Sequence, residues 1–344
     1  MKGGVINPIS VYPFPNFKAE QTKSYELGTN LRLFNNKINI DATVYLTDTY
    51  NQTFLSSMSP ASGYSGFYVQ AGKVRNKGIE LSLGYNDRFG KVGYATNLTY
   101  TANRNKIMKM VHDYKNPSDG SLFSITELTL QDKGGVYLRE KDAIGDVYVK
   151  GILARGKDGK LIEEEGGYKV DRSQRIKIGS VNPDFSIGWR HNVTWNNITL
   201  DLLFNGRFGG IVTSSTQAFL DDYGVSKDTY KARQNGGVWV NGTQYDAEKY
   251  YTTIGGEQLM AYYAYKATNI RLQEASLSYT LPGKWFGNVI NRLTVSAIGR
   301  NLWMIYNKAP FDPEMTSSTG TYNRGDVFMP PSLRSVGFSV KIEL

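Results

Sequence analysis

Apolar and polar residues alternate along much of this chain with a period of two, which is typical of a β-strand whose two faces meet different surroundings. Between residues 37 and 47 the alternation places five apolar side chains on one face: Ile38, Ile40, Ala42, Val44 and Leu46. The pattern predicts nine strands in all, at about 23–34, 37–50, 73–87, 91–104, 183–195, 197–208, 267–281, 291–306 and 332–344. In the seventh, the apolar positions change parity between Leu272 and Ala275, which predicts a β-bulge.

The connections between these strands alternate in length. Four are short, and three of these contain residues that tolerate a positive φ: Asn35-Asn36, Arg88-Phe89-Gly90 and Asn196-Asn197, with 282–290 as the fourth. The other four, at 51–72, 105–182, 209–266 and 307–331, are long and rich in Gly, Ser, Asn, Asp and Tyr. A soluble β-sandwich has no reason to place every long loop at one end of its strands. An outer-membrane barrel does, because its periplasmic turns are short and its extracellular loops are long.

The fold class that these patterns indicate is all-β, a transmembrane antiparallel β-barrel. Aromatic residues near the strand ends predict two girdles at the membrane interfaces. Those beside the short turns are Phe34, Tyr85, Phe89, Tyr94, Trp195 and Trp285, and those beside the long loops are Tyr25, Tyr50, Tyr100, Phe208, Trp303 and Tyr306.

The strand count suggests that this chain is part of a larger barrel. Bacterial barrels have an even number of strands and both chain ends on the periplasmic side. Counting back from the last strand, the first strand near Lys23 also runs from the outer side towards the periplasm. Nine strands would leave two unpaired edges in lipid, where each unpaired backbone group costs on the order of several kcal/mol. We therefore expect residues 1–344 to be the C-terminal portion of a barrel, with the residues before Lys23 ending another outer loop.

Several stretches resemble segments of the SusC/RagA-like TonB-dependent outer-membrane transporters, and they occur in the order found in that family. They are 19–28 with 33–37, then Val74-Arg75-Asn76-Lys77-Gly78-Ile79-Glu80-Leu81, 178–185 with its Asn182-Pro183-Asp184-Phe185, Gly299-Arg300-Asn301-Leu302, Phe311-Asp312-Pro313-Glu314 and 331–339. The resemblance implies a 22-stranded barrel of which this chain would supply the last nine strands. It also implies an upstream part with a plug domain and a TonB box, neither of which this sequence contains, and a SusD-like surface lipoprotein as a lid.

No cofactor or metal is expected. Many family members carry an acidic loop before the Asn-Pro strand, but here two lysines, Lys157 and Lys160, occupy the acidic positions, and Ca²⁺ requires several convergent oxygen ligands. The absence of cysteine excludes thiol catalysis, Cys-ligated zinc and iron–sulfur clusters. The two histidines, His112 and His191, are not accompanied by a nucleophile motif, so we expect no enzyme.

Charge does not indicate nucleic-acid binding. The 40 Lys and Arg exceed the 31 Asp and Glu by nine, but the basic residues are dispersed among acidic ones and form no long run. No stretch of the chain approaches the roughly 18 apolar residues of a membrane-spanning helix.

Period two directs a set of charged residues towards the lumen: Glu80, Arg190, Asp201, Arg207, Arg271 and Arg300. These residues would either make the barrel interior hydrophilic or contact the plug domain. The alternative is that they bind substrate directly. Aromatic residues of the long loops are candidates for stacking on a sugar or clamping a peptide, or alternatively for holding the loops together: Tyr64, Phe67, Tyr68, Trp239, Tyr245, Tyr250 and Tyr251.

The leading hypothesis is TonB-dependent import of a nutrient oligomer, an oligosaccharide or an oligopeptide, through the cell outer membrane. The expected partners are the upstream barrel and plug, TonB, a SusD-like lipoprotein and membrane lipid. A passive porin-like channel is the first alternative, and it would have no plug or TonB box upstream. A surface β-sandwich that binds glycans is the second, and it would turn its apolar faces inward.

Overall fold

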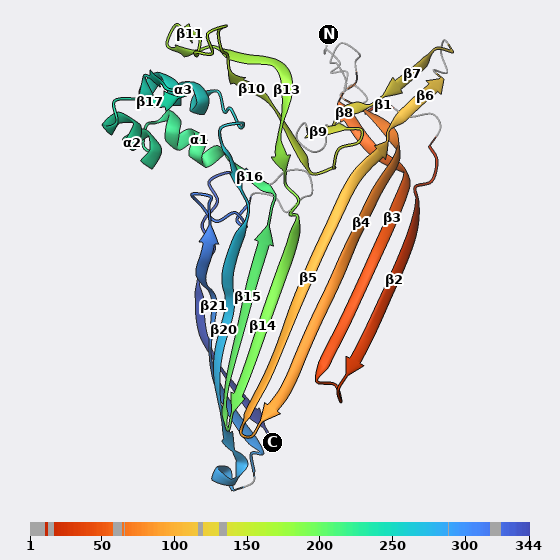
Figure 1. The fold of residues 1–344 in the computed structure, drawn as a ribbon, viewed down its shortest axis with the longest axis vertical. Coiled ribbons are helices and arrows are strands. Elements are labelled where there is room, and N and C mark those ends of the chain that lie inside the picture. Colours follow the sequence, from red (N-terminus) through yellow and green to blue (C-terminus); the bar gives the residue numbers. More distant parts are fainter. Residues whose placement is uncertain are drawn as a thin grey trace, which may run out of the picture.

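A computed structural model of the chain describes residues 11–12, 17–57, 64, 66–115, 120–130, 136–287, 289–316 and 325–344. Nine long strands form one curved sheet in which every long strand pairs antiparallel with its neighbour in the sequence (Figure 1). They are β2 (Gln21–Leu33), β3 (Ile38–Ser57), β4 (Gly66–Phe89), β5 (Val92–Lys109), β14 (Phe185–Trp195), β15 (Ile198–Phe208), β20 (Asn269–Pro282), β21 (Arg292–Asn307) and β23 (Ser335–Glu343). The fold is thus the antiparallel β-sheet that the alternation predicts.

Short turns connect the strands at one end of the sheet. Asn35, Asn36 and Asn196 have φ values of 56°, 65° and 50°, and Gly90 has a φ of 62°. Asparagine and glycine are the residues that reach this left-handed region most readily. The short link between β20 and β21 contains a 3₁₀ helix, η2 (Gly283–Phe286), followed by Gly287. The sequence therefore supplies turn residues wherever the chain reverses at this end.

The β-bulge expected in the seventh strand is confirmed at Gln273. On one side, the register with β15 steps from Leu203–Glu274 to Phe204–Leu272, and on the other side the register with β21 steps across the same residue. One extra residue in β20 reverses the parity of the positions beyond it. Apolar side chains consequently stay on the same face of the sheet on both sides of the bulge.

Three strands extend well beyond the ends that the sequence pattern predicts, and one of them, β5, continues to Lys109 rather than ending at 104. We expected a loop over 51–72, but β3 continues to Ser57 and β4 starts at Gly66, and the residues between lie mostly outside the described part of the chain. Near Val74 the two strands leave the region of simple alternation, because Phe54, Val69 and Val74 are buried in an outer lobe. Because these inward side chains are buried in the lobe, this part of the two strands lacks the alternation of polar and apolar residues.

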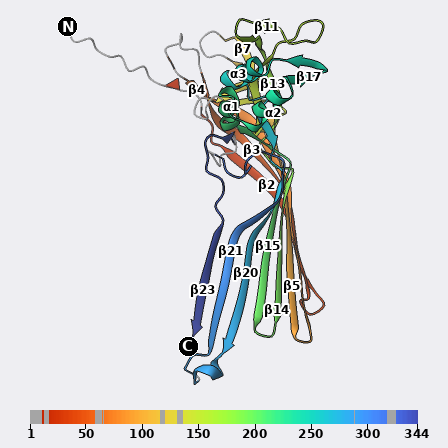
Figure 2. The ribbon, with the colours of Figure 1, turned by 90° about the vertical axis from the view of Figure 1, so that its left-hand side faces the viewer.

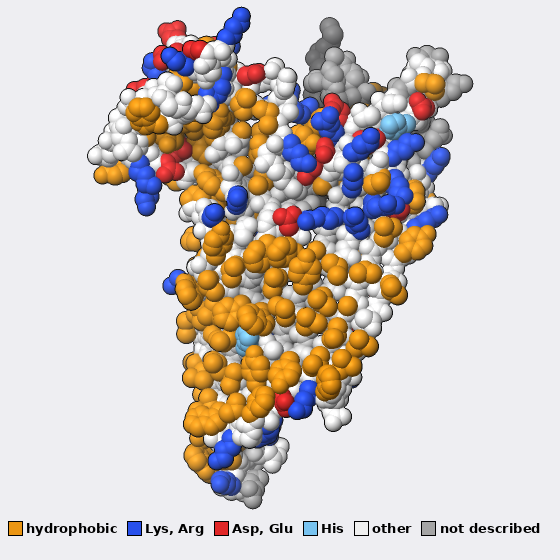
Figure 3. Space-filling model, in the orientation of Figure 1, with side chains coloured by type: hydrophobic (Ala, Val, Ile, Leu, Met, Phe, Trp, Pro, Cys, Tyr) orange, Lys and Arg blue, Asp and Glu red, His pale blue; other side chains and the backbone are white. Residues whose placement is uncertain are grey.

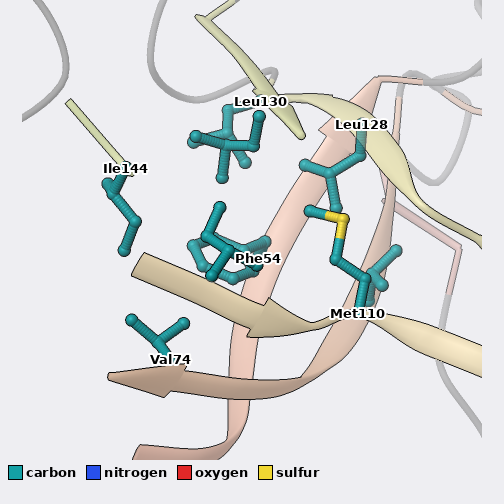
Figure 4. Packing of buried hydrophobic residues seen from close by; sticks show 9 residues of the cluster. Phe54, Val74, Met110, Leu128, Leu130 and Ile144 are labelled. Atoms are coloured by element: carbon teal, nitrogen blue, oxygen red, sulfur yellow. The ribbon is translucent and has the colours of Figure 1, made fainter. Parts of the chain in front are cut away.

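The sheet-borne lobe, as we call this first outer lobe, is built on the ends of β3, β4 and β5 from segments within the expected loop 105–182. Its added strands are β6 (Val111–Lys115), β7 (Leu122–Ile125), β8 (Glu127–Leu130) and β9 (Val136–Arg139), with β1 (Val11–Tyr12) pairing with β4. Its core contains Phe54, Val74, Met110, Leu128, Leu130 and Ile144 (Figure 4). The long strands and this lobe thus form one continuous structure.

The helical lobe is the second outer lobe and contains helices that the sequence analysis did not predict within 209–266. It consists of β10 (Asp146–Leu153), β11 (Glu163–Glu164), β12 (Gly167–Tyr168), β13 (Val170–Ser180), β16 (Ile211–Ser214), α1 (Ser215–Asp222), α2 (Lys227–Gln234), β17 (Val238–Val240), β18 (Thr243–Tyr245), α3 (Ala247–Gly256), β19 (Ala264–Lys266) and β22 (Gly325–Asp326). Ser214, Ser226 and Asp246 cap the three helices by accepting a backbone N–H three residues on. In the views of Figure 1 and Figure 2 this lobe lies at the long-loop end of the sheet.

One face of the sheet carries a broad band of exposed apolar side chains (Figure 3). Leu27 is 75% exposed, Leu277 is 55% exposed and Phe338 is 84% exposed. Aromatic residues expected in the girdles are also exposed, including Phe34, Trp195, Trp285 and Trp303. Charged side chains lie above and below this band rather than within it (Figure 3). None of the helices among the described residues has the length and hydropathy to cross a membrane.

Candidate functional site

The face of the sheet opposite the apolar band carries paired charges. Arg190 on β14 forms a two-point contact with Asp201 on β15, with Nη2 2.9 Å from Oδ1 and Nε 3.0 Å from Oδ2. Arg300 on β21 donates from Nε to Glu274 Oε2 on β20 at 3.0 Å. These pairs join neighbouring strands, and in each pair the two charges offset one another.

Nearer the long-loop end, the segment 307–316 folds over the polar face and brings further carboxylates to it. Arg271 on β20 donates to Asp312 from Nη2 at 2.8 Å and from Nη1 at 3.3 Å, and both side chains are 8% exposed. Ser332 also donates to Asp312. Burial alone would raise the pKa of Asp312, but the hydrogen bonds from Arg271 and Ser332 outweigh it, and the pKa is lowered. Asp312 is therefore ionised at neutral pH, and its ion pair with Arg271 attaches the segment 307–316 to β20 of the sheet.

Arg207 and Glu314 extend this network beneath the same segment. Arg207 donates from Nη2 to the Val181 carbonyl at 2.5 Å and lies 3.8 Å from Glu314 Oε1. Asn269 donates to Glu314 Oε1 at 3.0 Å and accepts from Arg271. Because Arg207 and Arg271 are buried, the loss of a carboxylate partner would leave a buried arginine uncompensated.

A hollow of about 690 Å³ adjoins this network on the polar face. Its lining is rich in hydroxyl and amide groups, from Thr99, Thr101, Asn205, Gln273 and Asn301, and it also includes the carboxylate of Glu314. A smaller hollow of about 240 Å³ shares Arg271, Asn301 and Ser332 with it. Because the arginines here are paired with carboxylates, the hollow offers mainly neutral hydrogen-bonding groups, which suit an uncharged polar ligand or a polar polypeptide surface.

The six charged residues expected at the lumen share the polar face of the sheet, but they differ in accessibility. Glu80, Arg190 and Arg300 are exposed, whereas Asp201, Arg207 and Arg271 are buried in the ion pairs described above. Arg207 and Arg271 already bind carboxylate and carbonyl oxygens of the protein, so we expect them to stabilise the fold rather than to bind a ligand directly. That the exposed members border a lumen stays a prediction.

The aromatic candidates of the outer loops also divide by burial. Tyr245 and Tyr250 lie in the core of the helical lobe, 7% and 9% exposed, and the Tyr245 hydroxyl accepts the Leu161 N–H at 3.1 Å. Tyr251 is partly buried against the same core, and burial raises its pKa to about 12. Of the two alternatives stated for Tyr245 and Tyr250, their burial favours the second, that they hold the outer segments together rather than contact a ligand.

The remaining aromatic candidates are more accessible. Trp239 on β17 is 61% exposed, and Tyr68 on β4 is 38% exposed with its ring 5.8 Å from that of Phe17. Phe67 packs against the core of the sheet-borne lobe, and Tyr64 is half-buried. Trp239 and Tyr68 lie on different lobes, so the structure does not bring the seven candidates into one aromatic cluster.

Neither histidine lies in a catalytic arrangement. His112 Nε2 lies 2.5 Å from Glu140 Oε2 in the sheet-borne lobe. His191 belongs to the apolar face, where its Nδ1 is 2.9 Å from the Tyr94 hydroxyl and its ring centroid 4.3 Å from that of Trp189. In the turn at 155–160, Asp158 accepts the Lys160 N–H and Arg155 donates to the Gly159 carbonyl. Across the described ranges, no three or more acidic or histidine side chains converge to hold a metal.

Sequence reasoning missed three carboxylates that complete the polar face: Glu274, Asp312 and Glu314. A signal existed for two of them, since Phe311-Asp312-Pro313-Glu314 is among the family-like stretches. Nothing in the sequence alone indicated that these residues reach back to Arg271 and Arg207, because the contact spans 41 residues or more.

Comparison with known proteins identifies relatives over most of the chain. The family model described as "TonB dependent receptor-like, beta-barrel" matches residues 4–202. "TonB-dependent receptor P3" of Formosa agariphila is 24% identical over 321 residues, which cover 87% of this chain and 31% of that protein. The chain thus spans about a third of the length of the curated relatives that it matches.

Solved structures of similar fold agree. The structure of the RagAB peptide transporter matches with a TM-score of 0.67 at 18% identity, covering 94% of this chain and 35% of that one. The RagAB peptide importer in its "closed-closed" state matches with a TM-score of 0.69 at 18% identity over the same shares. At this identity the likeness concerns the fold.

Proposed function

The chain belongs to the TonB dependent receptor-like β-barrel family and lies in the outer membrane, and on that premise we propose that it forms wall and outer loops of an importer for a nutrient oligomer. The single observation that carries this proposal is the division of the sheet into an exposed apolar band on one face and paired charges on the other. A wall between lipid and an aqueous bore requires this division. A β-sandwich would instead bury the apolar side chains against a second sheet.

The partners that we propose begin with the rest of the barrel. Within the described residues, β2 and β23 each pair along one side only, with β3 and β21 respectively. Their free edges would join the upstream strands, because unpaired backbone groups are not tolerated in lipid. The paired charges and the polar hollow would then face a plug domain or cargo, TonB would supply energy to move the plug, and a SusD-like lipoprotein would close the outer side.

The cargo that we propose is an oligosaccharide or an oligopeptide. The exposed aromatic rings Trp239 and Tyr68 offer flat contact surfaces at low entropic cost. The solved structures of similar fold bear the word peptide in their names, which makes peptides the first cargo to test.

The test is uptake in a strain whose only copy of the complete transporter is supplied on a plasmid. Labelled oligopeptides and oligosaccharides would be offered with and without a functional TonB. We expect uptake of one class, lost without TonB and reduced in Trp239→Ala. The matched control is Trp285→Ala, which removes an equally exposed tryptophan from η2 at the short-turn end. Uptake that continues without TonB would refute active import and favour the passive channel.

A further inference from the structure

We propose that the long-loop end of the apolar face is a binding surface for the phosphate groups of an anionic lipid headgroup in the outer leaflet. The proposal rests on the barrel assignment above and goes beyond it. The surface, here the basic rim, consists of six side chains on the strands β2, β4 and β5, with β3 lying between β2 and β4: Lys23, Lys73, Arg75, Lys77, Arg104 and Lys106.

Strand register places the basic rim directly above the apolar band. Lys23 on β2, Asp48 on β3, Arg75 on β4 and Lys106 on β5 are neighbours in one row across the sheet. Two residues further along the strands, the next row contains Tyr25, Leu46, Lys77 and Arg104. The row after that is wholly apolar: Leu27, Val44, Ile79 and Ala102. Figure 3 shows basic side chains gathered just beyond the band on this face.

Contacts within the basic rim fix part of it in place. Asp48, 5% exposed, accepts from Arg75 Nε at 2.7 Å and Nη2 at 2.8 Å and lies 2.6 Å from Lys73 Nζ. The Tyr50 ring centroid lies 5.7 Å from Lys23 Nζ and 5.1 Å from Lys73 Nζ. Since Asp48 and Tyr50 hold these cations on one face, less ordering is needed when an anion binds.

The basic rim has more positive charge than its carboxylates neutralise. Arg104 forms an ion pair with Asp184 at 3.0 Å, and Asp48 forms ion pairs with both Lys73 and Arg75. The six cationic side chains of the basic rim are therefore paired with only two carboxylates among the described residues. Among the residues that the structure describes, no carboxylate lies within ion-pair distance of Lys23, Lys77 or Lys106, and all three are exposed. These three long cationic side chains therefore carry charge that no described carboxylate neutralises, and they can reach an anion at the edge of the membrane.

The position of the basic rim favours a lipid headgroup, rather than a cargo molecule, as its ligand. The basic rim shares the apolar face, whereas a cargo in the bore would meet the opposite face. An acyl chain that passes over Ile79 towards the short-turn end would place its headgroup at the level of Lys77 and Lys106, which lie one and two rows nearer the long-loop end. Each lysine near an anionic membrane surface strengthens binding by about fivefold.

The experiment uses the complete transporter containing this chain, purified in a neutral detergent. It would be titrated with bisphosphorylated lipid A in mixed micelles and with the same lipid after removal of both phosphates, and bound lipid would be counted by native mass spectrometry. The test variant is Lys23→Gln/Lys77→Gln/Lys106→Gln. The matched control, Lys157→Gln/Lys160→Gln/Lys227→Gln, removes the same charge from exposed lysines of the helical lobe. The heat-dependent shift of the barrel in gel electrophoresis would show that both variants fold.

We expect the test variant to bind the phosphorylated lipid on the order of a hundredfold more weakly than the control variant, which should match the natural protein. Raised salt should weaken binding to the natural protein and change the test variant little. Equal binding of the two variants, or equal binding of the dephosphorylated lipid, would overturn the proposal. Displacement by millimolar inorganic phosphate would overturn the lipid assignment too. Cargo uptake is measured separately, so failure here would leave the import proposal standing.

Discussion

An arginine introduced at the middle of the apolar band should cost far more free energy than one introduced on the opposite face. Leu98 on β5 is the site for this change. The outward positions of β5 run from Val92 to Ala102, which is ten residue steps. At about 3.4 Å per step they extend roughly 34 Å along the strand. A strand tilt of about 40° reduces this to about 26 Å across the membrane, close to the ~25 Å apolar band of outer-membrane barrels.

Leu98 lies four steps from Ala102, or about 10 Å below the outer limit of the band and near its middle. Leu98→Arg should therefore lower the free energy of unfolding by about 2–4 kcal/mol, and Ala102→Arg by about 0–1 kcal/mol. Thr99→Arg, at almost the same depth on the polar face, should cost about 1 kcal/mol or less because its charge stays in contact with water or polar protein.

The assay is denaturant unfolding of the complete barrel folded into phospholipid vesicles, followed by tryptophan fluorescence. Equal costs for Leu98→Arg and Thr99→Arg would refute the assignment of the apolar face to lipid. A larger cost at Thr99 than at Leu98 would indicate that the two faces are exchanged.

Three further changes test other parts of the structure. Asp312→Ala should destabilise the barrel by about 3–5 kcal/mol, because it leaves Arg271 buried without a partner, and Arg271→Leu in the same chain should recover much of that loss; additive losses in the unfolding free energies would contradict the pairing. Gly78→Ala should cost about 1–3 kcal/mol, since the new Cβ would lie 2.5 Å from the Ala102 carbonyl oxygen and the Tyr45 ring. The control Gly93→Ala, whose Cβ would meet its nearest neighbour at 3.7 Å, should be nearly neutral, and a similar cost at both sites would rule the close approach out. Burial raises the pKa of Asp221 in α1. The protonated carboxyl group therefore contributes fully to the stability of the helical lobe at a pH below the ordinary carboxyl pKa, and this contribution is lost as the pH rises through the raised pKa. Hydrogen exchange of the α1 amides should slow at low pH beyond the intrinsic chemical effect, and a profile unchanged by Asp221→Asn would contradict this account.

The membrane-spanning part of the fold was accessible to sequence reasoning because one physical constraint repeats in every strand. A strand with lipid on one side and a polar surrounding on the other must alternate, so the apolar positions from Ile79 to Leu83 mark the strand and its outward face together. The bulge at Gln273 was also predictable, because the apolar positions of this strand change parity once, between Leu272 and Ala275. The turn residues Asn35 and Asn196 marked the reversals.

The outer lobes were not accessible in this way, because their residues satisfy different constraints. Phe54 and Val69 pack into a small core formed with β8 and β9, which interrupts the two-residue pattern. The helices α1 to α3 are at most ten residues long and depend on caps such as Ser226, which a long polar loop also contains in abundance. Loop aromatics such as Tyr245 cannot be assigned to a core or a binding surface from residue type alone.

The polar face was predicted in part for a similar reason. Period two identified the arginines that share it, including Arg190 and Arg271, but their partners come from other segments. Asp312 meets Arg271 only after the chain has formed β21 and turned back over the sheet. Contacts of this separation depend on tertiary geometry, which local pattern does not encode.

The two outermost strands have a practical consequence for handling this chain. β2 presents 13 residues and β23 presents 9 residues with one side of the backbone unpaired in the described structure. Produced alone in water, such ladders of free N–H and C=O groups beside apolar side chains would join copies edge to edge. We therefore expect the isolated polypeptide to collect in inclusion bodies, and soluble handling to depend on co-folding with the strands that complete both edges.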